Sequence, residues 1–546
     1  MHPMTVFVNG SVFTGHGRRS RPGAVGVRDG RIVSVGEPAD VLAAAGPGAD
    51  VVDLAGGLLM PGFQDAHAHP VCAGHAMLEC DLRALSTPDE YLAEIARYAR
   101  ARPDLEWITG GGWSLASFPG GTPSRHLLDA VVADRPVVLP CQDAHSSWVN
   151  SRALELAGVD RSTPDPPDGR VERDEHGDPS GTLHEGAMSL VGRLVPAPSE
   201  ADLDAGLLAA QERLFSHGVT AWQDAIVGGG FNGFPDPYAA YLRAGASGAL
   251  RARVVGALWW DRERGAEQIP ELIERRAGGR AGRFAATSIK IMQDGIVENF
   301  TAALTEPYRD ACGCVTANAG LSFVEPAALR EHVTRLDAEG FQVHFHALGD
   351  RAVREALDAV EAARDANGPG DRRHHLAHLQ VVHPDDVRRF AALGAVANIQ
   401  PLWACHEPQM DELTIPFLGG RLAARQYPFG DLWRAGVRLA AGSDWPVSSP
   451  DPLWGAHVAV NRALPGQSRP PFLPGQALDL ATVLTAYTAG SAYVNHLEHE
   501  TGTIEVGKDA DLTVLDRDPF DHPADEIGAT RVARTYMQGE LVYTAS

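Results

Sequence analysis

The sequence places two histidines, His67 and His69, two residues apart in the segment Gly62–Pro70. Side chains alternate along a strand, so both imidazoles project from one face if this segment is extended. Two converging imidazoles can hold a divalent cation, and a strand end is the usual place for an active site in a (β/α)8 barrel. The pair alone is weak evidence for a metal site, because histidine is a common half-buried residue, so its interpretation depends on companions elsewhere in the chain.

One companion is Lys290, which alternates with apolar residues in Ser288–Met292. A buried ammonium is costly unless it is modified or paired. Burial lowers the pKa of the ammonium, and a neutral amine can capture carbon dioxide as a carbamate that bridges two metal ions. The alternative is an ion pair between Lys290 and Asp294.

Two more histidines close apolar, strand-like runs. His346 lies nearer the turn than His344, so we expect His346 to be the ligand and His344 to be a supporting or core residue. His378 ends a second run. The histidines around it are interpreted as surface residues: His374, His375 and His383.

Asp444 directly follows the apolar run 437–441. A carboxylate there can ligate a metal and take a proton from metal-bound water. The alternative is a turn or helix-capping aspartate. Taken in order, the candidates are an HxH pair, a strand lysine, two strand-end histidines and a strand-end aspartate. Such ligands suit one or two divalent ions, with zinc expected and iron, manganese or nickel as alternatives.

Composition restricts the class of protein. The 546 residues are 44% hydrophobic and 21% charged, with a formal net charge of −23, which disfavours nucleic acid and anionic membranes as partners. No apolar stretch reaches the length of a membrane span, and the N-terminus lacks a basic segment followed by an apolar core. The six cysteines form no paired CxxC sets. We therefore predict a reduced, cytoplasmic protein.

The chain divides into two terminal segments and one long middle segment. Strand-like runs with tight turns, including Asp29-Gly30, occupy 1–57 and 500–546, and together they predict one small β-sandwich domain. The middle, 58–499, alternates strands and helices, which predicts a parallel sheet and, at this length, a (β/α)8 barrel in an α/β protein. Residues 72–200 break that rhythm and are interpreted as an insertion that covers the active-site mouth.

The periodicity of the middle gives specific elements. We predict helices over Pro88–Ala101, Ser199–His217, Ala327–Glu339, Asp350–Asn367 and Pro384–Leu393. We predict strands over 219–222, 254–258, 287–291, 342–346 and 437–441.

These motifs together resemble the amidohydrolase superfamily, and more narrowly its YtcJ-like group, often labelled amidohydrolase 3. The resemblance covers nearly the whole chain and is carried by Pro61–His69, Lys290–Gly295, His346–Asp350, Gly442–Val447 and Gly502–Leu512. Within the insertion, the segments that look specific to the YtcJ-like group are Gly112-Trp113, Asp143–Leu154 and Gly181–Glu185. One departure is Ala377, where the family usually has a glutamate before the histidine.

The resemblance implies a distorted barrel with a mononuclear or binuclear metal centre. His67 and His69 would hold the more buried ion, Lys290 as a carbamate would bridge, and His346 and His378 would hold a second ion. Asp444 would ligate and act as general base toward a metal-activated hydroxide.

The expected function is therefore metal-dependent hydrolysis of a C–N bond in a small molecule, as in an amide, an N-substituted formamide or a cyclic amide. N-substituted formamide deformylases are similar members of the group. We expect Trp113, His145 and Trp445 to line the pocket, with His145 contacting the carbonyl; the alternative makes the tryptophans core residues and His145 a helix cap. Competing hypotheses are an ester, lactone or carbamate hydrolase, and a non-catalytic scaffold. The resemblance also suggests a homodimer.

Overall fold

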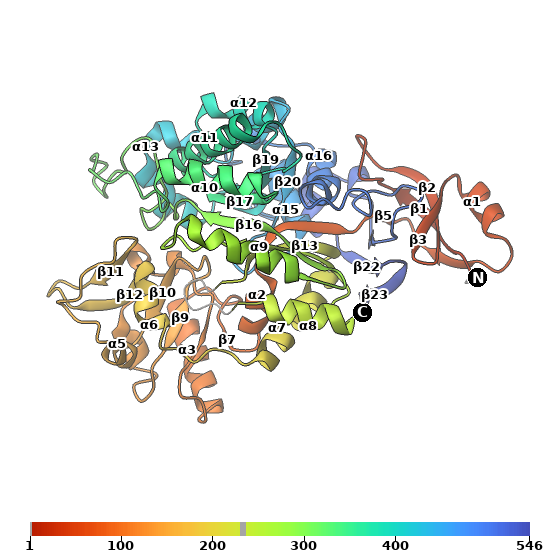
Figure 1. The fold of residues 1–546 in the computed structure, drawn as a ribbon. Coiled ribbons are helices and arrows are strands. Elements are labelled where there is room, and N and C mark those ends of the chain that lie inside the picture. Colours follow the sequence, from red (N-terminus) through yellow and green to blue (C-terminus); the bar gives the residue numbers. More distant parts are fainter. Residues whose placement is uncertain (1–2, 230–235, 546) are drawn as a thin grey trace.

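The computed structural model describes residues 3–229 and 236–545, and its centre is a parallel barrel (Figure 1). Eight strands follow one another in a single hydrogen-bonded order, and every neighbouring pair is parallel. In sequence they are β6 (Phe63–Ala68), β13 (Val219–Val227), β14 (Arg253–Trp259), β16 (Phe284–Met292), β17 (Gln342–Ala347), β18 (His375–His378), β19 (Val396–Ile399) and β20 (Leu439–Ala441). The predicted α/β barrel is confirmed.

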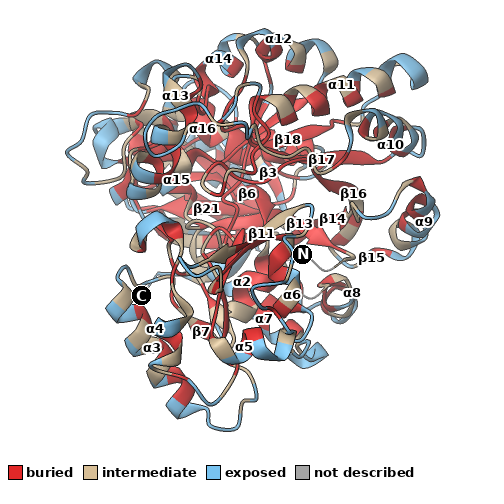
Figure 2. Cartoon of the chain, turned by 90° about the vertical axis from the view of Figure 1, so that its left-hand side faces the viewer, coloured by how far each residue is buried: buried red, intermediate tan, exposed pale blue. Residues whose placement is uncertain are grey.

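Helices surround the barrel, and their outer faces are exposed while their inner faces are buried (Figure 2). All five predicted helices are present within one residue of the predicted bounds: α3 (Pro88–Ala101), α7 (Glu200–Ser216), α10 (Pro326–Ala338), α11 (Asp350–Asn367) and α12 (Pro384–Leu393). Local chemistry explains one of the starts. Ser199 caps α7 by accepting from Asp202, whose carboxylate accepts in return from the backbone of Ser199.

Strands from the two ends of the chain share one sheet. Its order is β23-β22-β21-β5-β1-β2-β3, with β4 paired to β1. The strands are β1 (Thr5–Val12), β2 (Arg21–Arg28), β3 (Arg31–Gly36), β4 (Asp50–Asp53), β5 (Leu58–Pro61), β21 (Leu512–Leu515), β22 (Val532–Met537) and β23 (Glu540–Thr544). Asp29 and Gly30, both with positive φ, form the predicted hairpin turn between β2 and β3. The assignment of this sheet and the barrel to separate domains stays a prediction.

The chain between β6 and β13 builds a smaller unit beside the barrel, drawn in orange and yellow in Figure 1. It contains an antiparallel sheet of order β11-β12-β10-β9 and the parallel pair β7-β8. Their bounds are β7 (Cys80–Asp81), β8 (Gly110–Gly111), β9 (Val138–Pro140), β10 (Ser146–Val149), β11 (Gly169–Arg173) and β12 (Pro179–Glu185). Among the described residues, no helix is both long and apolar enough to cross a membrane.

The first and last barrel strands are joined through the segment that follows β20. Asp444 donates its backbone N–H to the carbonyl of His67 at 2.7 Å, and His69 donates to the carbonyl of Trp445 at 2.8 Å. The buried Asp65 carboxylate accepts from the backbone of Ser443 at 3.0 Å, from the Ser443 hydroxyl, and from the backbone of His67 at 3.0 Å. These bonds place the end of β6 against the segment that carries Asp444.

Asp65 is therefore expected to hold the barrel closed. Asp65→Asn replaces one acceptor oxygen by a donor, which leaves at least one of its three donors unsatisfied. We expect the free energy of unfolding to fall by about 1–3 kcal/mol in urea titrations. The exposed Asp104 provides the control, because Asp104→Asn should change it by less than about 0.5 kcal/mol. Equal effects of the two substitutions would contradict this role for Asp65.

Candidate metal centre

Three barrel strand ends bring His67, His378 and Asp444 together. Their candidate ligand atoms all lie within 4.8 Å of one another, and all three residues are buried. His67 Nε2 lies 3.2 Å from Asp444 Oδ1, and His378 Nδ1 lies 3.8 Å from Asp444 Oδ2. His69 joins them, with Nε2 3.0 Å from Asp444 Oδ1. Both histidines of the HxH pair thus reach the same carboxylate oxygen, which is the convergence that strand alternation predicts.

A row of histidines fixes the orientation of His67. Its Nδ1 lies 2.8 Å from His344 Nε2, and the ring of His344 packs on that of His375 with centroids 4.0 Å apart. His344 therefore supports a candidate ligand, one of the two roles expected for it. The interpretation of His374 and His375 as surface residues is wrong, because His375 lies on the buried strand β18 and His374, which directly precedes that strand, is buried as well.

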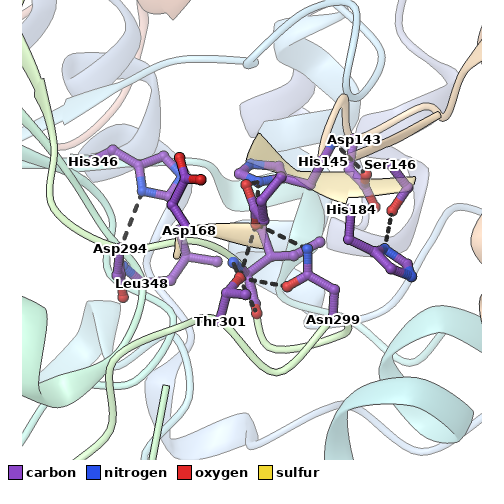
Figure 3. A network of polar contacts seen from close by, with 12 residues as sticks. Asp143, His145, Ser146, Asp168, His184, Asp294, Asn299, Thr301, His346 and Leu348 are labelled. Carbon is purple, nitrogen blue, oxygen red and sulfur yellow. Dashed lines mark hydrogen bonds and ion pairs between the residues drawn. The ribbon is translucent and has the colours of Figure 1, made fainter. Parts of the chain in front are cut away.

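Lys290 projects from β16 into the same centre. Its Nζ is buried and has no hydrogen-bond partner among the described residues. The alternative pairing with Asp294 is not seen. Asp294 instead lies with Oδ1 3.3 Å from His346 Nδ1 (Figure 3), and it accepts backbone N–H groups from Ala303, Leu348 and Gly349. Asp294 thus orients the His346 ring, whose centroid lies 4.5 Å from that of His378.

Burial sets the charge of these groups. It lowers the pKa of Lys290 to about 7 and that of His67 to about 3, because each would lose hydration as a cation. Burial alone would raise the pKa of Asp444, but His67 and His69 outweigh it and hold this pKa well below its usual range. Neutral imidazoles beside an ionised carboxylate are the protonation states in which these side chains bind metal.

The centre faces a cavity of about 60 Å³, hereafter the site cavity. Its walls include the candidate ligands His67, His69, Lys290, His346, His378 and Asp444, together with His145, Cys72, Ala144, Trp259 and Pro446. All six sequence-predicted ligands therefore share one cavity. Trp259 was missed by the sequence reasoning, although an aromatic residue at the end of a predicted strand could have indicated it.

The predicted pocket walls differ in position. His145 lines the site cavity, whereas Trp113 and Trp445 do not. Trp113 is fully buried within the unit between β6 and β13 and donates its indole N–H to the carbonyl of Leu139 at 2.7 Å. Trp445 is buried beside the barrel, and its backbone carbonyl accepts from His69. Both tryptophans thus lie in core positions, as the alternative interpretation expected.

His145, labelled in Figure 3, is held by the buried carboxylate of Glu185. Its Nδ1 lies 2.9 and 3.0 Å from the two oxygens of Glu185, which also accepts from Asn299 and Thr301 at 2.8 Å each. Burial alone disfavours the charged imidazole, but Glu185 outweighs it and raises the pKa of His145 to about 9. Since Nδ1 is occupied, Nε2 is the ring nitrogen left for a molecule in the cavity.

The donor set fits a divalent metal ion. Imidazole nitrogens and a carboxylate converge at a buried point, which is the ligand chemistry of zinc and of related transition metals. The Nζ of Lys290 and the Nε2 of His378 are both buried, and within 3–229 and 236–545 neither has a hydrogen-bond partner. Groups of this kind are costly to bury unless something coordinates them.

Comparisons with known proteins agree with this geometry. A sequence profile of the amidohydrolase family matches residues 50–543. The putative amidohydrolase YtcJ of Bacillus subtilis is 30% identical, over 99% of both chains. The N-substituted formamide deformylase of Arthrobacter pascens is 29% identical, over 98% of both. A solved structure, an uncharacterized metal-dependent hydrolase from Pyrococcus furiosus, superposes with a TM-score of 0.72 at 26% identity, covering 95% of this chain and 100% of its own.

Metal binding can be measured directly. We expect metal-stripped protein to take up Zn²⁺ and to melt at a higher temperature once it is loaded. His378→Asn should weaken the affinity by about 10-fold or more, because it removes one converging nitrogen. His499→Asn, at an exposed histidine, should leave it unchanged. Titration followed by elemental analysis gives the affinity and the number of ions. Equal affinities in all three proteins would place the metal elsewhere.

Proposed function

Because the chain belongs to the amidohydrolase family, we propose that it is a metal-dependent hydrolase that cleaves the C–N bond of a small amide, N-substituted formamide or cyclic amide. The observation that carries this proposal is the convergence of His67, His69, His378 and Asp444 on one buried cavity. The similarity to an N-substituted formamide deformylase favours that subclass. A cytoplasmic location and a homodimer remain predictions from the sequence.

The proposed centre holds two ions, as the family resemblance implies. His67, His69 and Asp444 would hold one ion, and His346 with His378 would hold a second, with Lys290 as a carbamate between them. A divalent metal, when bound, acidifies a coordinated water and polarises the carbonyl oxygen of the substrate. The low pKa of the Lys290 amine supports the carbamate, since only an uncharged amine can add to carbon dioxide.

Asp444 is the proposed general base. Its carboxylate lies among the candidate ligands and stays ionised, so it can accept the proton of the attacking water. The water oxygen bonds to the carbonyl carbon, and the C–N bond then breaks as Asp444 delivers the proton to the leaving nitrogen. The products are a carboxylic acid and an amine, and transfer of the acid proton to the amine gives a carboxylate and an ammonium ion. The carbonyl end of this substrate lies in the site cavity.

His145 is the proposed contact for the substrate carbonyl. Its ring lies 5.6 Å from that of His346, centroid to centroid, on the wall of the site cavity. Glu185, anchored by Asn299 and Thr301, holds the ring so that Nε2 faces the reacting group. A hydrogen bond from this position would stabilise negative charge as it develops on the carbonyl oxygen.

The competing functions use the same residues. Esters, lactones and carbamates also offer a carbonyl to an activated water, so the candidate ligands do not separate them from amides. A non-catalytic scaffold is disfavoured, because all the expected ligand positions are occupied and face one cavity. A protein that holds no metal after careful reconstitution would revive it.

Substrate class is tested with a panel. We expect metal-loaded protein to hydrolyse at least one class among N-alkyl and N-aryl formamides, N-acyl amino acids, cyclic amides and lactones. Asp444→Asn should lower kcat by about 10²–10⁴-fold, because it removes the base. Release of amine, carboxylate or alcohol gives the rate. Turnover confined to lactones would replace the amide assignment, and an Asp444→Asn variant as active as the parent would refute the role of Asp444.

The role of Glu185 has a matched control in the same sheet. Glu172 pairs with His184 at 3.2 Å, and neither residue lines the site cavity. We expect Glu185→Gln to lower kcat/KM by about 10–100-fold through mispositioning of His145, with most of the loss in kcat. Glu172→Gln should change it by less than about twofold, although both substitutions break a carboxylate–imidazole pair. Similar losses in both variants would reduce the role of Glu185 to stability.

A further inference from the structure

The loop between β16 and α10 contains a short turn that carries two cysteines. Arg309 and Val315 pair as an isolated antiparallel bridge, and the turn between them includes Cys312, Gly313 and Cys314. Both cysteines are free and exposed, whereas the other four cysteines of the chain are buried: Cys72, Cys80, Cys141 and Cys405. The exposed thiols of the protein are thus gathered at one place, outside the metal centre.

Hydrogen bonds within the turn fix the two cysteines relative to each other. Oδ1 of Asp310 accepts the backbone N–H groups of Cys312 and Cys314, each at 2.9 Å. Asp310 also donates its backbone N–H to the carbonyl of Cys314 at 2.9 Å, and Gly313, with a φ of 76°, donates to the carbonyl of Asp310 at 2.8 Å. Because the cysteines are two residues apart, their Cα atoms are at most about 7 Å apart, which is within the reach of two thiols that share one partner.

The surroundings supply a positive charge but no third ligand. Arg309 donates from Nη1 to the carbonyl of Gly313 at 2.8 Å, and it has no carboxylate partner among the residues that the structure describes. Across residues 3–229 and 236–545, one group of three or more potential ligand side chains could hold a metal ion, and it consists of His67, His378 and Asp444. The cysteine pair therefore offers two sulfur ligands, with a guanidinium beside the turn.

Two thiolates without a third ligand select among metal ions. Structural zinc sites and iron–sulfur clusters take four protein ligands, which this turn does not supply. Copper(I) is a soft ion that thiolates bind preferentially, and two sulfur ligands in a linear arrangement satisfy it. Its complex with two thiolates carries one negative charge, which the Arg309 guanidinium offsets.

We propose that Cys312 and Cys314 together bind one copper(I) ion, at a metal site separate from the proposed hydrolytic centre. Each thiol releases its proton to solvent as its sulfur bonds to the ion, and the oxidation state of copper does not change. No residue of the hydrolytic centre takes part, so this site and the proposed hydrolysis can fail independently.

Copper(I) binding is measured on the full-length protein after its metal centre has been loaded with Zn²⁺. The ion is supplied without oxygen as its bathocuproine disulfonate complex, whose absorbance falls as copper passes to the protein. We expect uptake of one ion per chain, and X-ray absorption should show two sulfur neighbours and no nitrogen. Half an ion per chain would indicate a site shared by two copies, and nitrogen neighbours would place the ion on histidines; either result overturns the proposal.

Substitutions test the pair itself. Cys312→Ser and Cys314→Ser each leave a single thiolate, so the affinity for copper(I) should fall by about 100-fold or more, because the chelating second sulfur is lost. The control is Val315→Ser at the next residue, which is 63% exposed, and it should leave the affinity unchanged. Iodoacetamide followed by mass spectrometry should label Cys312 and Cys314 before loading and neither after it. Equal affinities in the parent and both cysteine variants, or a thiol that stays reactive after loading, would refute the site.

Discussion

The contact between the two ends of the barrel sheet is the constraint on which the candidate centre depends. His67 lies on the first strand and His69 directly follows that strand, whereas Asp444 follows the last strand, 375 residues after His69. Asp65 and the backbone bonds of His67 and His69 hold these segments together. Gly442 permits the approach, because a Cβ there would lie 2.6 Å from the backbone nitrogen of His67. Without this contact, the histidine pair would lack its carboxylate.

Burying imidazoles, an amine and a carboxylate together lowers the free energy of unfolding. Neighbouring groups offset part of this loss through polar contacts with the cluster. His344 supports His67, and Asp294 supports His346 while three backbone N–H groups hold it in place. Two candidate ligands also have left-handed backbones, with φ of 79° at His378 and 56° at Asp444. Strain of this kind is kept where a packed surrounding fixes a side chain that function needs. The centre therefore lowers the stability of the fold, and His344 and Asp294 hold its side chains in place.

Local patterns in the sequence were enough for much of the fold. The five helices followed from apolar periodicity, and the candidate ligands followed from polar residues at the ends of apolar runs. Local patterns did not predict which polar residues are buried. The pattern predicted His374 and His375 as surface residues, yet His375 lies on the buried strand β18 and the preceding His374 is buried beside Asp337, with His374 Nε2 3.1 Å from Asp337 Oδ1. Asp65 passed unnoticed because its partner Ser443 is 378 positions away, and no local pattern reports a contact of that separation.

The order of strands in the terminal sheet has a consequence for synthesis of the chain. β5 lies between β1 and β21, and β6 begins only two residues after β5 ends. While the ribosome makes the barrel, β5 therefore has no partner on its β21 side, since β21 follows every barrel strand in the sequence. A strand that is buried in the folded protein but still unpaired in the nascent chain exposes free backbone N–H and C=O groups. Other nascent chains can pair with these groups. The protein should thus be most vulnerable to aggregation after the barrel strands have been made and before β21 pairs with β5.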